Sequence, residues 1–402
     1  MISHFLKLYL PSVFLLSAAV YLALYPQSYP APVSLLLESA PVALPVFGAS
    51  ICFWLRKSNP VFAFSLVAIF AYFVDVLSAT QTVAVYIILP LCWLVLALSE
   101  ERGLLTPSGF TKAASLVVLA LIIFSLDYPA GDLGIFANFW IDLHYVLHWR
   151  PGWGPGLALP ALALATFSLA TLLLTVRLTR KHRPLDAGYL GALIALFGSG
   201  LRQGDQGATA IFLILISLLL ILALFQESHR MAFLDELTGI PGRRALLADM
   251  KKLGRRYSLA MVDVDFFKKF NDNYGHDVGD QVLRMIASRL SQTGGGSRAY
   301  RYGGEEFTLL FPGKDAKEAI DYLEEVRERI EKTAFVVRGQ DRPNKKPKRT
   351  AGPSGNKRVK ITVSIGLSER KDKQDEPEDI MKNADRALYK AKDKGRNCVI
   401  RN

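Results

Sequence analysis

The stretch Arg301-Tyr-Gly-Gly-Glu-Glu-Phe307 separates two runs of strand-forming residues, at 298–302 and 307–311. Adjacent glycines can adopt the positive φ angles that a two-residue hairpin turn requires, so the stretch predicts a β-hairpin with both glycines in its turn. Glycines also let the phosphates of a ligand approach the backbone. The two glutamates follow at the rim of the hairpin, where carboxylates can hold Mg²⁺ and take a proton. A tight hairpin with an acidic edge explains the same string, so the rest of the chain must decide.

Composition divides the chain into two parts. A length of 402 residues favours two domains. Hydrophobic residues make up 51% of the chain, the mean hydropathy is +0.23, and nearly all of this excess lies before Phe225. The net charge of +12 is typical of nucleic-acid binding, but nine lysines or arginines against one acid fall in the loop 338–360, so no nucleic-acid partner is expected. Cys52, Cys92 and Cys398 form neither a disulfide framework nor a zinc pattern.

The N-terminal half contains eight apolar runs, each about long enough to span a bilayer. The basic residues Arg56-Lys57, Arg102 and the cluster at 177–183 fall on the same side, which the positive-inside rule assigns to the cytoplasm. Both termini are then cytoplasmic, and no cleavage site for a signal peptide stands out. No inverted repeat stands out in the sequence, so a transporter is a poor fit. The eight runs are 6–25, 34–55, 60–79, 82–99, 113–128, 156–177, 187–202 and 207–226.

Several residues in the apolar half are candidates for function. Glu38 and Asp75 lie inside the runs, where an ionisable side chain is costly, unless each belongs to a helix end. His144 and His148 are four residues apart in the aromatic-rich connection 127–154, so a helix would place them on one face. A re-entrant or interfacial helix anchored by its aromatic residues is the main interpretation of this connection. A metal or ligand site is the alternative.

From Met231 onward, short strands alternate with helices. This order predicts an α/β sandwich with a mixed central sheet. The strand that ends at Asp263 and the glutamates of the hairpin can then converge at one sheet edge. The expected elements are a helix at 242–253, a strand at 257–265, a helix at 278–290, the hairpin, a helix at 316–332, a strand at 360–367, a helix at 377–392 and a strand at 398–400.

The polar residues around this edge suit a purine nucleotide and a cation. The carboxylate of Asp263 and the carbonyl of Val264 can face a cation at the strand end. Asn271 offers an amide, and Asp280 can accept hydrogen bonds from N1–H and the exocyclic amine of guanine, whereas adenine presents the opposite pattern at N1. Each residue also has an ordinary explanation, as a cap or a turn residue, when it is taken singly.

Basic residues follow the same pattern. Lys268 comes five residues after Asp263 and can pair with phosphate charge. Lys392 and Arg396 are four residues apart at the end of the last helix and can clamp terminal phosphates.

Residues 227–402 resemble the GGDEF-type diguanylate cyclases, in a Gly-Gly-Glu-Glu-Phe form of the signature. The resemblance implies a palm-like fold similar to nucleotidyl cyclases, one GTP per domain, and a homodimer that makes cyclic di-GMP and pyrophosphate. The matching runs are Asp235-Glu-Leu-Thr-Gly-Ile-Pro-Gly-Arg-Arg244, Val262-Asp-Val-Asp-Phe-Phe-Lys268, Asn271-Asp-Asn-Tyr-Gly-His-Asp-Val-Gly-Asp280, the signature itself, Thr362-Val-Ser-Ile-Gly366, and Ala384-Asp together with Lys392-Asp-Lys-Gly-Arg-Asn397.

The resemblance also implies roles for single residues. Glu305 is the implied proton acceptor, and Glu306 supports the metal. Two Mg²⁺ ions, or Mn²⁺, are implied for each active site. The implied metal ligands are Asp263, Val264, Glu305 and Glu306, and the implied substrate-binding residues are Phe267, Lys268, Asn271, His276, Asp280, Gly303, Gly304, Lys392 and Arg396.

The expected organisation is a membrane domain of about eight helices at 1–226, a connecting helix at 227–236 and a cyclase domain at 237–402, in a bacterial inner membrane. Two departures from the family pattern stand out. Gly242 stands where the family often has Asn. The place of the Arg-x-x-Asp product-inhibition motif reads Gly294-Gly-Gly-Ser297, so charge pairing to the product is absent there.

Three questions stay open at this point. The basic insert 338–360 can be a solvated loop or can bind anionic lipid. The domain can be a non-catalytic receptor for GTP or a cyclic dinucleotide, although no catalytic position is missing. The membrane half can be a sensor, an anchor, or a receptor or transporter that the C-terminal domain regulates.

Overall fold

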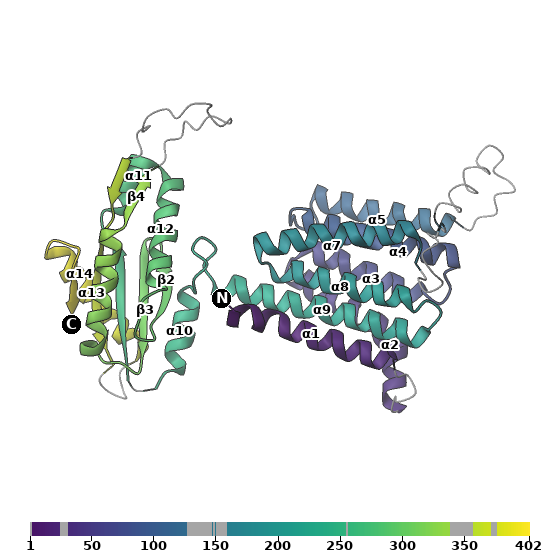
Figure 1. The fold of residues 1–402 in the computed structure, drawn as a ribbon, viewed down its shortest axis with the longest axis horizontal. Coiled ribbons are helices and arrows are strands. Elements are labelled where there is room, and N and C mark those ends of the chain that lie inside the picture. Colours follow the sequence, from purple (N-terminus) through teal and green to yellow (C-terminus); the bar gives the residue numbers. More distant parts are fainter. Residues whose placement is uncertain are drawn as a thin grey trace. The chain divides into compact units, whose positions relative to one another are not determined.

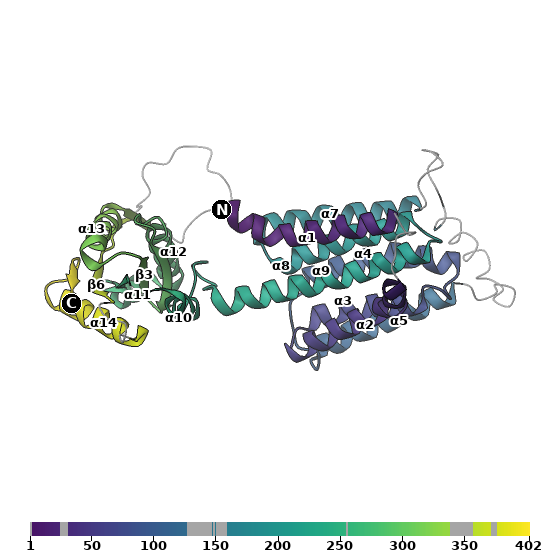
Figure 2. The same ribbon diagram turned by 90° about the horizontal axis from the view of Figure 1, so that it is seen from below.

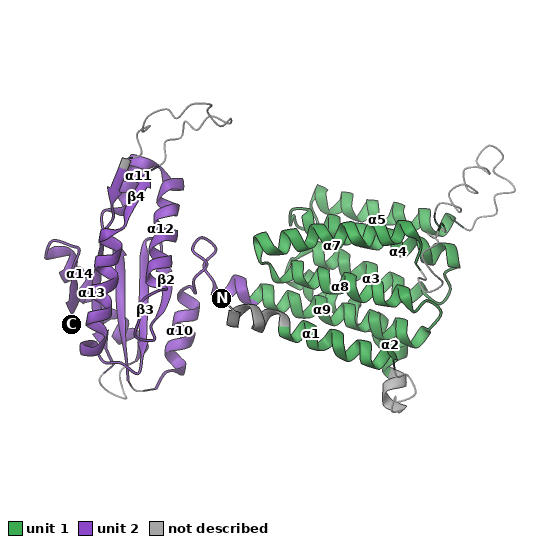
Figure 3. Ribbon diagram, in the orientation of Figure 1, with its two compact units in different colours: residues 1–228 green, residues 229–402 purple. Residues whose placement is uncertain are grey.

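The computed structural model describes residues 2–24, 31–126, 147, 149, 159–254, 256–337, 357–370 and 376–402. These residues form two compact units, 1–228 and 229–402 (Figure 3). His144, His148 and most of the basic insert lie outside the described residues, so the expectations for them stay untested.

Unit 1 is a bundle of long apolar helices that run side by side (Figures 1 and 2). The eight helices given below coincide with the eight apolar runs. They are α1 (Ile2–Leu24), α2 (Ala31–Trp54), α3 (Ser58–Phe73), α4 (Ala79–Leu98), α5 (Pro107–Ser125), α7 (Ala161–Lys181), α8 (Pro184–Leu201) and α9 (Gln206–Phe233).

Six of these helices are long and apolar enough to cross a membrane, and α3 and the Leu10–Leu24 part of α1 are shorter apolar helices. The chain is therefore a multi-pass membrane protein, whereas the orientation of its termini stays a prediction. The bundle is packed through large apolar side chains such as Trp93, which is fully buried.

Asp75 does not lie inside a helix. It occupies the turn between α3, which ends at Phe73, and α4, whose first turn is capped by Ser78 through reciprocal hydrogen bonds with Gln81. For Asp75 the alternative of a helix-end residue is therefore confirmed, and the expectation of a carboxylate inside a span is wrong, because the helix ends before it. Glu38 does lie within α2 and is exposed.

Helix α9 is 28 residues long and runs without a break past the boundary between the units at residues 228 and 229. Its apolar stretch packs closely on α8: a Cβ atom at Gly188 would lie 2.4 Å from the Cβ of Ala223, so a glycine is needed at this position. Its last residues, 229–233, belong to unit 2.

Unit 2 contains a five-stranded sheet with the strand order β2-β3-β1-β6-β7. All neighbouring strands are antiparallel except β6 and β7, which are parallel, so the predicted mixed sheet is confirmed. The strands are β1 (Tyr257–Val264), β2 (Arg298–Gly303), β3 (Glu306–Pro312), β6 (Val363–Glu369) and β7 (Val399–Arg401).

Helices cover both faces of this sheet (Figure 2). Every residue of β1 is buried, because Ala260 and Val262 pack toward α11–α13 while Leu259 and Met261 pack toward α10 and α14. Gly366 of β6 lets α14 pack directly on the sheet, since a Cβ there would lie 2.1 Å from the backbone nitrogen of Leu388. The helices are α10 (Arg243–Lys252), α11 (Phe267–Tyr274), α12 (His276–Leu290), α13 (Ala316–Lys332) and α14 (Pro377–Asp393).

Two expectations about elements are corrected. The strand expected at 360–367 is two strands: β5 (Lys357–Lys360) pairs with β4 (Ala334–Val337) in a separate two-stranded sheet, and β6 belongs to the main sheet. The chain leaves β5 before Thr362, whose hydroxyl and carbonyl bind Asp265. Helix α11 was not expected, because eight residues give too little periodicity to detect it.

Candidate active site

The hairpin of β2 and β3 has Gly304 and Glu305 in its turn, because Gly303 pairs with Glu306. Neither Gly303 nor Gly304 has a positive φ angle, so the expectation of a left-handed glycine pair is wrong. The strand pairing shifts register between Arg301 and Gly303, and this irregularity shapes the end of the hairpin instead. A side chain at Gly304 would meet no atom within 4 Å, so the backbone there is open to a ligand.

Arg301 holds the hairpin to the N-terminal turn of the unit. Its guanidinium donates to the carbonyl of Gly304 at 2.6 and 3.1 Å and to the two carboxylate oxygens of Asp235 at 2.9 and 3.0 Å. Sequence reasoning did not single out this arginine, although its place three residues before the turn glycine is a usable signal. The contact fixes the position of the turn that carries Glu305.

Asp235 is a charge-balanced carboxylate. It also accepts hydrogen bonds from the backbone and the hydroxyl of Thr238, at 2.8 and 2.6 Å. Burial opposes its ionisation, but the hydrogen bonds from Thr238 and Arg301 outweigh burial, and the pKa of Asp235 is lowered.

The end of β1 meets the hairpin. Asp263 pairs with Glu306 in the sheet register, and the backbone N–H of Val264 donates to the carbonyl of Glu305 at 3.4 Å. The side chain of Asp263 is buried, and one carboxylate oxygen lies 2.9 Å from the Nζ of Lys392. Residues from three distant parts of the chain therefore meet at one sheet edge, as the sequence predicted.

Negative charge is not balanced at this edge. Burial raises the pKa of Asp263, against the opposing effect of Lys392. Burial and then the charge of Asp263 raise the pKa of Glu305, Lys392 again opposes, and Glu306 adds to the rise. Lys392 thus opposes the charge of both carboxylates, and Arg396 also opposes that of Asp263, but burial outweighs both cations. A carboxylate site with raised pKa values is typical of a place that takes up a proton or a cation.

Asp265, which directly follows β1 and is two residues from Asp263, has a different environment. It accepts hydrogen bonds from the hydroxyls of Thr362 and Ser364, at 2.7 and 2.6 Å, and from the backbone N–H of Asn397 at 3.2 Å. These contacts join β1, the start of β6 and the turn after α14. Asp265 therefore acts as a structural tie at the floor of the site.

The residues expected to bind a base lie on α11 and α12. The side-chain oxygen of Asn271 is buried and accepts no hydrogen bond from the described residues. Gly279 makes room for it, because a Cβ atom there would lie 1.9 Å from that oxygen. Asp280 follows Gly279 in α12 and is half-buried. His276 begins α12 and is exposed.

The remaining phosphate-binding candidates lie around the turn after β1. Phe267 is buried in the core, and Lys268 is exposed. Within the described residues, neither Lys268 nor Asp280 makes an ion pair. The guanidinium of Arg396 lies 4.4 Å from the ring centroid of Phe266.

The donor set fits a hard divalent cation. The carboxylates of Asp263 and Glu305 and the carbonyl of Val264 are oxygen donors, which Mg²⁺ prefers, and a cation would supply the missing positive charge. Across the described ranges, no three His, Cys, Asp or Glu side chains are grouped to hold a metal ion. Water and oxygens of a bound phosphate would complete the coordination.

The segment at the expected product-inhibition motif contains no charged side chain. Gly295 and Gly296 have φ angles of +71°, and Gly295 lies against the ring of Tyr322. This turn leaves no cation or anion to pair with a cyclic dinucleotide.

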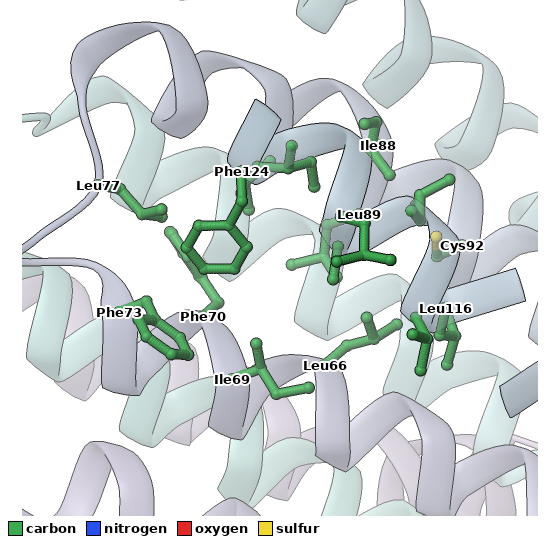
Figure 4. Close-up of a pocket in the computed structure, with 16 residues that line it drawn as sticks. Leu66, Ile69, Phe70, Phe73, Leu77, Ile88, Leu89, Cys92, Leu116 and Phe124 are labelled. Atoms are coloured by element: carbon green, nitrogen blue, oxygen red, sulfur yellow. The ribbon is translucent and has the colours of Figure 1, made fainter. Parts of the chain in front are cut away.

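Unit 1 contains a cavity of about 310 Å³ between α3, α4 and α5 (Figure 4). Its wall is formed by leucine, isoleucine, valine, alanine and phenylalanine side chains, and the thiol of Cys92 is its only heteroatom-bearing side chain. Such a cavity suits hydrocarbon and offers no partner to a polar ligand.

Comparison with known proteins identifies the C-terminal unit. Residues 232–398 match the family "Diguanylate cyclase, GGDEF domain". The chain is 35% identical over 185 residues to the response regulator PleD of Caulobacter vibrioides, covering 43% of this chain and 37% of PleD. It is 43% identical over 173 residues to the diguanylate cyclase VdcA of Vibrio cholerae, covering 42% and 47%.

The GGDEF domain of DgcB from Caulobacter crescentus, solved in complex with c-di-GMP, is 35% identical and covers 42% of this chain and 93% of that chain, with a TM-score of 0.36. The chain spans less than half the length of the curated relatives PleD and VdcA.

Proposed function

Because residues 232–398 form a GGDEF domain of the diguanylate cyclase family, we propose that the chain condenses two molecules of GTP into cyclic di-GMP and pyrophosphate. One observation carries the proposal beyond family likeness: Asp263, Glu305 and Lys392 meet at the hairpin edge with an excess of negative charge. That excess is what a site for Mg²⁺ and triphosphate requires.

The reaction joins two nucleotides through two identical displacements. In each, the 3′-oxygen of one GTP forms a bond to the α-phosphorus of the other, and the bond from that phosphorus to the pyrophosphate breaks. The proton of the 3′-hydroxyl passes to Glu305, whose raised pKa suits it to this role. A bound Mg²⁺ would polarise the α-phosphate and neutralise charge on the leaving pyrophosphate.

The residues around the edge divide the substrate between them. Asp263, the Val264 carbonyl and Glu305 would hold the metal, with Glu306 in support. Asn271 and Asp280 would accept hydrogen bonds from guanine, and His276 would lie at the nucleoside end. The open backbone at Gly303 and Gly304 and the cations Lys268, Lys392 and Arg396 would take the phosphates, beside the backbone of Phe267.

Each chain supplies one GTP and one set of groups, so the reaction needs a homodimer. We place the GGDEF domain in the cytoplasm, where GTP is found, below a bacterial inner membrane. The membrane helices would act as a sensor or an anchor, and α9 would carry any signal because it continues into the domain. The basic insert 338–360 would contact anionic lipid.

Incubation of the full-length chain in membranes with GTP and Mg²⁺ tests this function, with the product identified by mass spectrometry. Cyclic di-GMP and pyrophosphate in a ratio of one to two are expected, and ATP in place of GTP is the control. The alternative function, a non-catalytic receptor for GTP or a cyclic dinucleotide, predicts binding of GTP without turnover.

A further inference from the structure

Phe266 is an exposed aromatic residue at the edge of the candidate active site, and the proposed chemistry gives it no role. It is 63% exposed and has a φ angle of +57°, which is an unfavourable backbone conformation for a bulky side chain. An exposed ring in a strained conformation needs a reason. The ring faces the guanidinium of Arg396, 4.4 Å from its centroid.

The partner of this ring is held in the same manner. Arg396 and Asn397 have φ angles of +65° and +47°. The turn that carries them is held at two points. The backbone N–H of Asn397 donates to Asp265, directly after β1, at 3.2 Å, and the side-chain oxygen of Asn397 accepts from Arg327 of α13 at 3.0 Å. Asp265 and Asn397 are bonded, so the residues next to them, Phe266 and Arg396, are brought face to face.

The charge of Arg396 opposes the rise in the pKa of Asp263 that burial causes, but the two side chains form no direct ion pair. Among the described residues its guanidinium makes no ion pair, whereas Lys392 is paired with Asp263. The side chain of an arginine that has no ion pair stays mobile, and it loses this conformational freedom when it binds a phosphate. Stacking on an aromatic face removes part of that freedom in advance and leaves the N–H groups of the guanidinium free at its edge.

We propose that Phe266 is a positioning residue that holds Arg396 ready for the phosphates of GTP. This inference rests on the proposed function, and it adds a residue that binds no substrate itself. Because Arg396 would contact phosphates in the ground state and the transition state alike, loss of the ring should weaken binding of GTP and leave the chemical step unchanged.

The test measures KM and kcat for GTP with the full-length chain carrying Phe266→Leu, Phe266→Trp, Arg396→Ala, or both Phe266→Leu and Arg396→Ala. Phe266→Leu should raise KM about two- to fivefold with kcat nearly unchanged, the size expected for an exposed cation–π contact. Phe266→Trp keeps a ring and should restore KM. Phe266→Leu should have no further effect once Arg396 is alanine.

Tyr389→Leu is the matched control, because Tyr389 is an equally exposed aromatic residue of the same unit, at 67%. An unchanged or lower KM in Phe266→Leu, or an equal effect in the Arg396→Ala background, would overturn the proposal. Affinity for a non-hydrolysable GTP analogue is measured in parallel. If the wild-type chain makes no cyclic di-GMP, the proposed function fails, while analogue binding still decides the role of Phe266.

The cavity of unit 1 carries a second, independent inference. Helix α5 is fastened at both ends: Lys112 donates to the side-chain oxygen of Asn59 at 2.6 Å, and Gln81 donates to the carbonyl of Phe124 at 3.3 Å. Between these ties α5 has no buried residue, since Gly109, the one buried residue of the helix, comes before Lys112. The cavity of about 310 Å³ lies in this unpacked stretch.

We infer that an acyl chain of a membrane phospholipid occupies this cavity. Water would find no hydrogen-bond partner there, and α4 and α5 are long and apolar enough to span a bilayer, so hydrocarbon is the available filling. On α4 the cavity is lined by residues of the middle of the helix, from Val85 to Cys92, and on α5 it extends to Phe124 at the tied C-terminal end.

Reconstitution of the full-length chain in vesicles containing a phosphatidylcholine with a diazirine in its acyl chain tests the inference. Photolabelling should concentrate on α3, α4 and α5 and fall at least threefold in Ala120→Trp, which fills the cavity. Leu172→Trp on the exposed face of α7 should leave labelling unchanged. Even labelling of all exposed helix faces, unaffected by Ala120→Trp, would contradict the inference, as would crosslinks that show a second copy of the chain covering α5.

Discussion

The carboxylates of unit 2 belong to two kinds of region. Asp235 and Asp265 are structural ties, which means that hydrogen bonds satisfy their oxygens and connect separate segments of the chain. Asp235 accepts from Arg301 and Thr238 and holds the hairpin, and Asp265 accepts from Thr362 and Ser364 and holds the sheet edge. Asp263 and Glu305 lie at the rim, where Lys392 opposes the charge of both and Arg396 opposes that of Asp263. Hydrogen bonds lower the pKa of Asp235 below its ordinary value, and burial raises the pKa of Asp263 and Glu305 above theirs.

The opposite pKa shifts distinguish carboxylates that stabilise the fold from carboxylates that are suited to take part in the reaction. A carboxylate whose hydrogen bonds favour its charge stabilises the folded state, whereas a buried carboxylate without enough positive charge is costly and is ready to bind a cation or a proton. The ties therefore hold the rim in place, and the rim is left reactive.

The largest effect should come from the rim. Glu305→Gln keeps the shape of the side chain but removes its charge, so the rate of cyclic di-GMP formation should fall roughly thousandfold, the range for loss of a general base. Thermal unfolding should not shift downward, because the folded state already penalises this charge. Substantial remaining turnover in Glu305→Gln would show that Glu305 is not the proton acceptor.

A change at a structural tie should lower stability, in contrast to the loss of activity expected at the rim. Arg301→Ala removes the guanidinium donors from the carbonyl of Gly304 and from Asp235, which keeps only its hydrogen bonds from Thr238. This change should lower the free energy of unfolding of the separately expressed residues 229–402 by about 2 kcal/mol. Urea unfolding monitored by circular dichroism measures this. Exposed Arg298→Ala, whose contact with Asp249 is long at 3.4 Å, is the control and should cost little.

The pH dependence of the same variants sharpens the result. Because the folded pKa of Asp235 is lowered, its stabilising effect is complete above the unfolded pKa of 3.8 and is lost as the pH falls further toward the folded pKa. The stability difference between wild type and Arg301→Ala should therefore shrink at acid pH. A difference that stays constant would show that Arg301 acts through Gly304 alone.

Asp280 is a carboxylate outside both regions, half-buried and without an ion pair among the described residues. Asp280→Ser should reduce the preference for GTP over ATP roughly tenfold, since a hydroxyl cannot accept two hydrogen bonds from guanine as a carboxylate does. Competition of GTP and ATP for a fluorescent analogue measures the preference. An unchanged ratio would show that the base is read elsewhere.

The comparison between the two units gives the smallest expected effect. Four Gly-Ser residues inserted after Glu227 interrupt α9 and should lower the activity of the full-length chain several-fold. The separately expressed residues 229–402, which lack the insertion site, are the reference for the activity of the uncoupled domain. Seven helix-forming residues at the same place keep nearly the same helix face, at 3.6 residues per turn, and should preserve activity. Equal activity of both insertions would reduce the membrane unit to an anchor.

The sequence predicted the helices and the mixed sheet well, because apolar runs and alternating elements leave strong periodic signals. The sequence also predicted that Asp263 and the hairpin glutamates converge at one edge of the sheet. It failed where short contacts decide: the turn conformation at Gly303 and Gly304, the eight-residue helix α11, and the break that Asp265 makes between β5 and β6. The place of Arg301 before the turn glycine is a local signal for its contact with Gly304, but its second partner, Asp235, is 66 residues away in the chain, so no local pattern reveals that contact.

Asp263 and Asp265 offer the most direct test, since they are two residues apart, both buried, and can be changed by the same substitution. The measurement is the rate of cyclic di-GMP formation and the free energy of unfolding for Asp263→Asn and Asp265→Asn. Asp263→Asn should lose activity at least about a hundredfold without loss of stability, and Asp265→Asn should lose about 1–2 kcal/mol of stability and keep most of its activity per folded molecule. The same response in both variants, or the reverse assignment, would contradict the division into a reactive rim and structural ties.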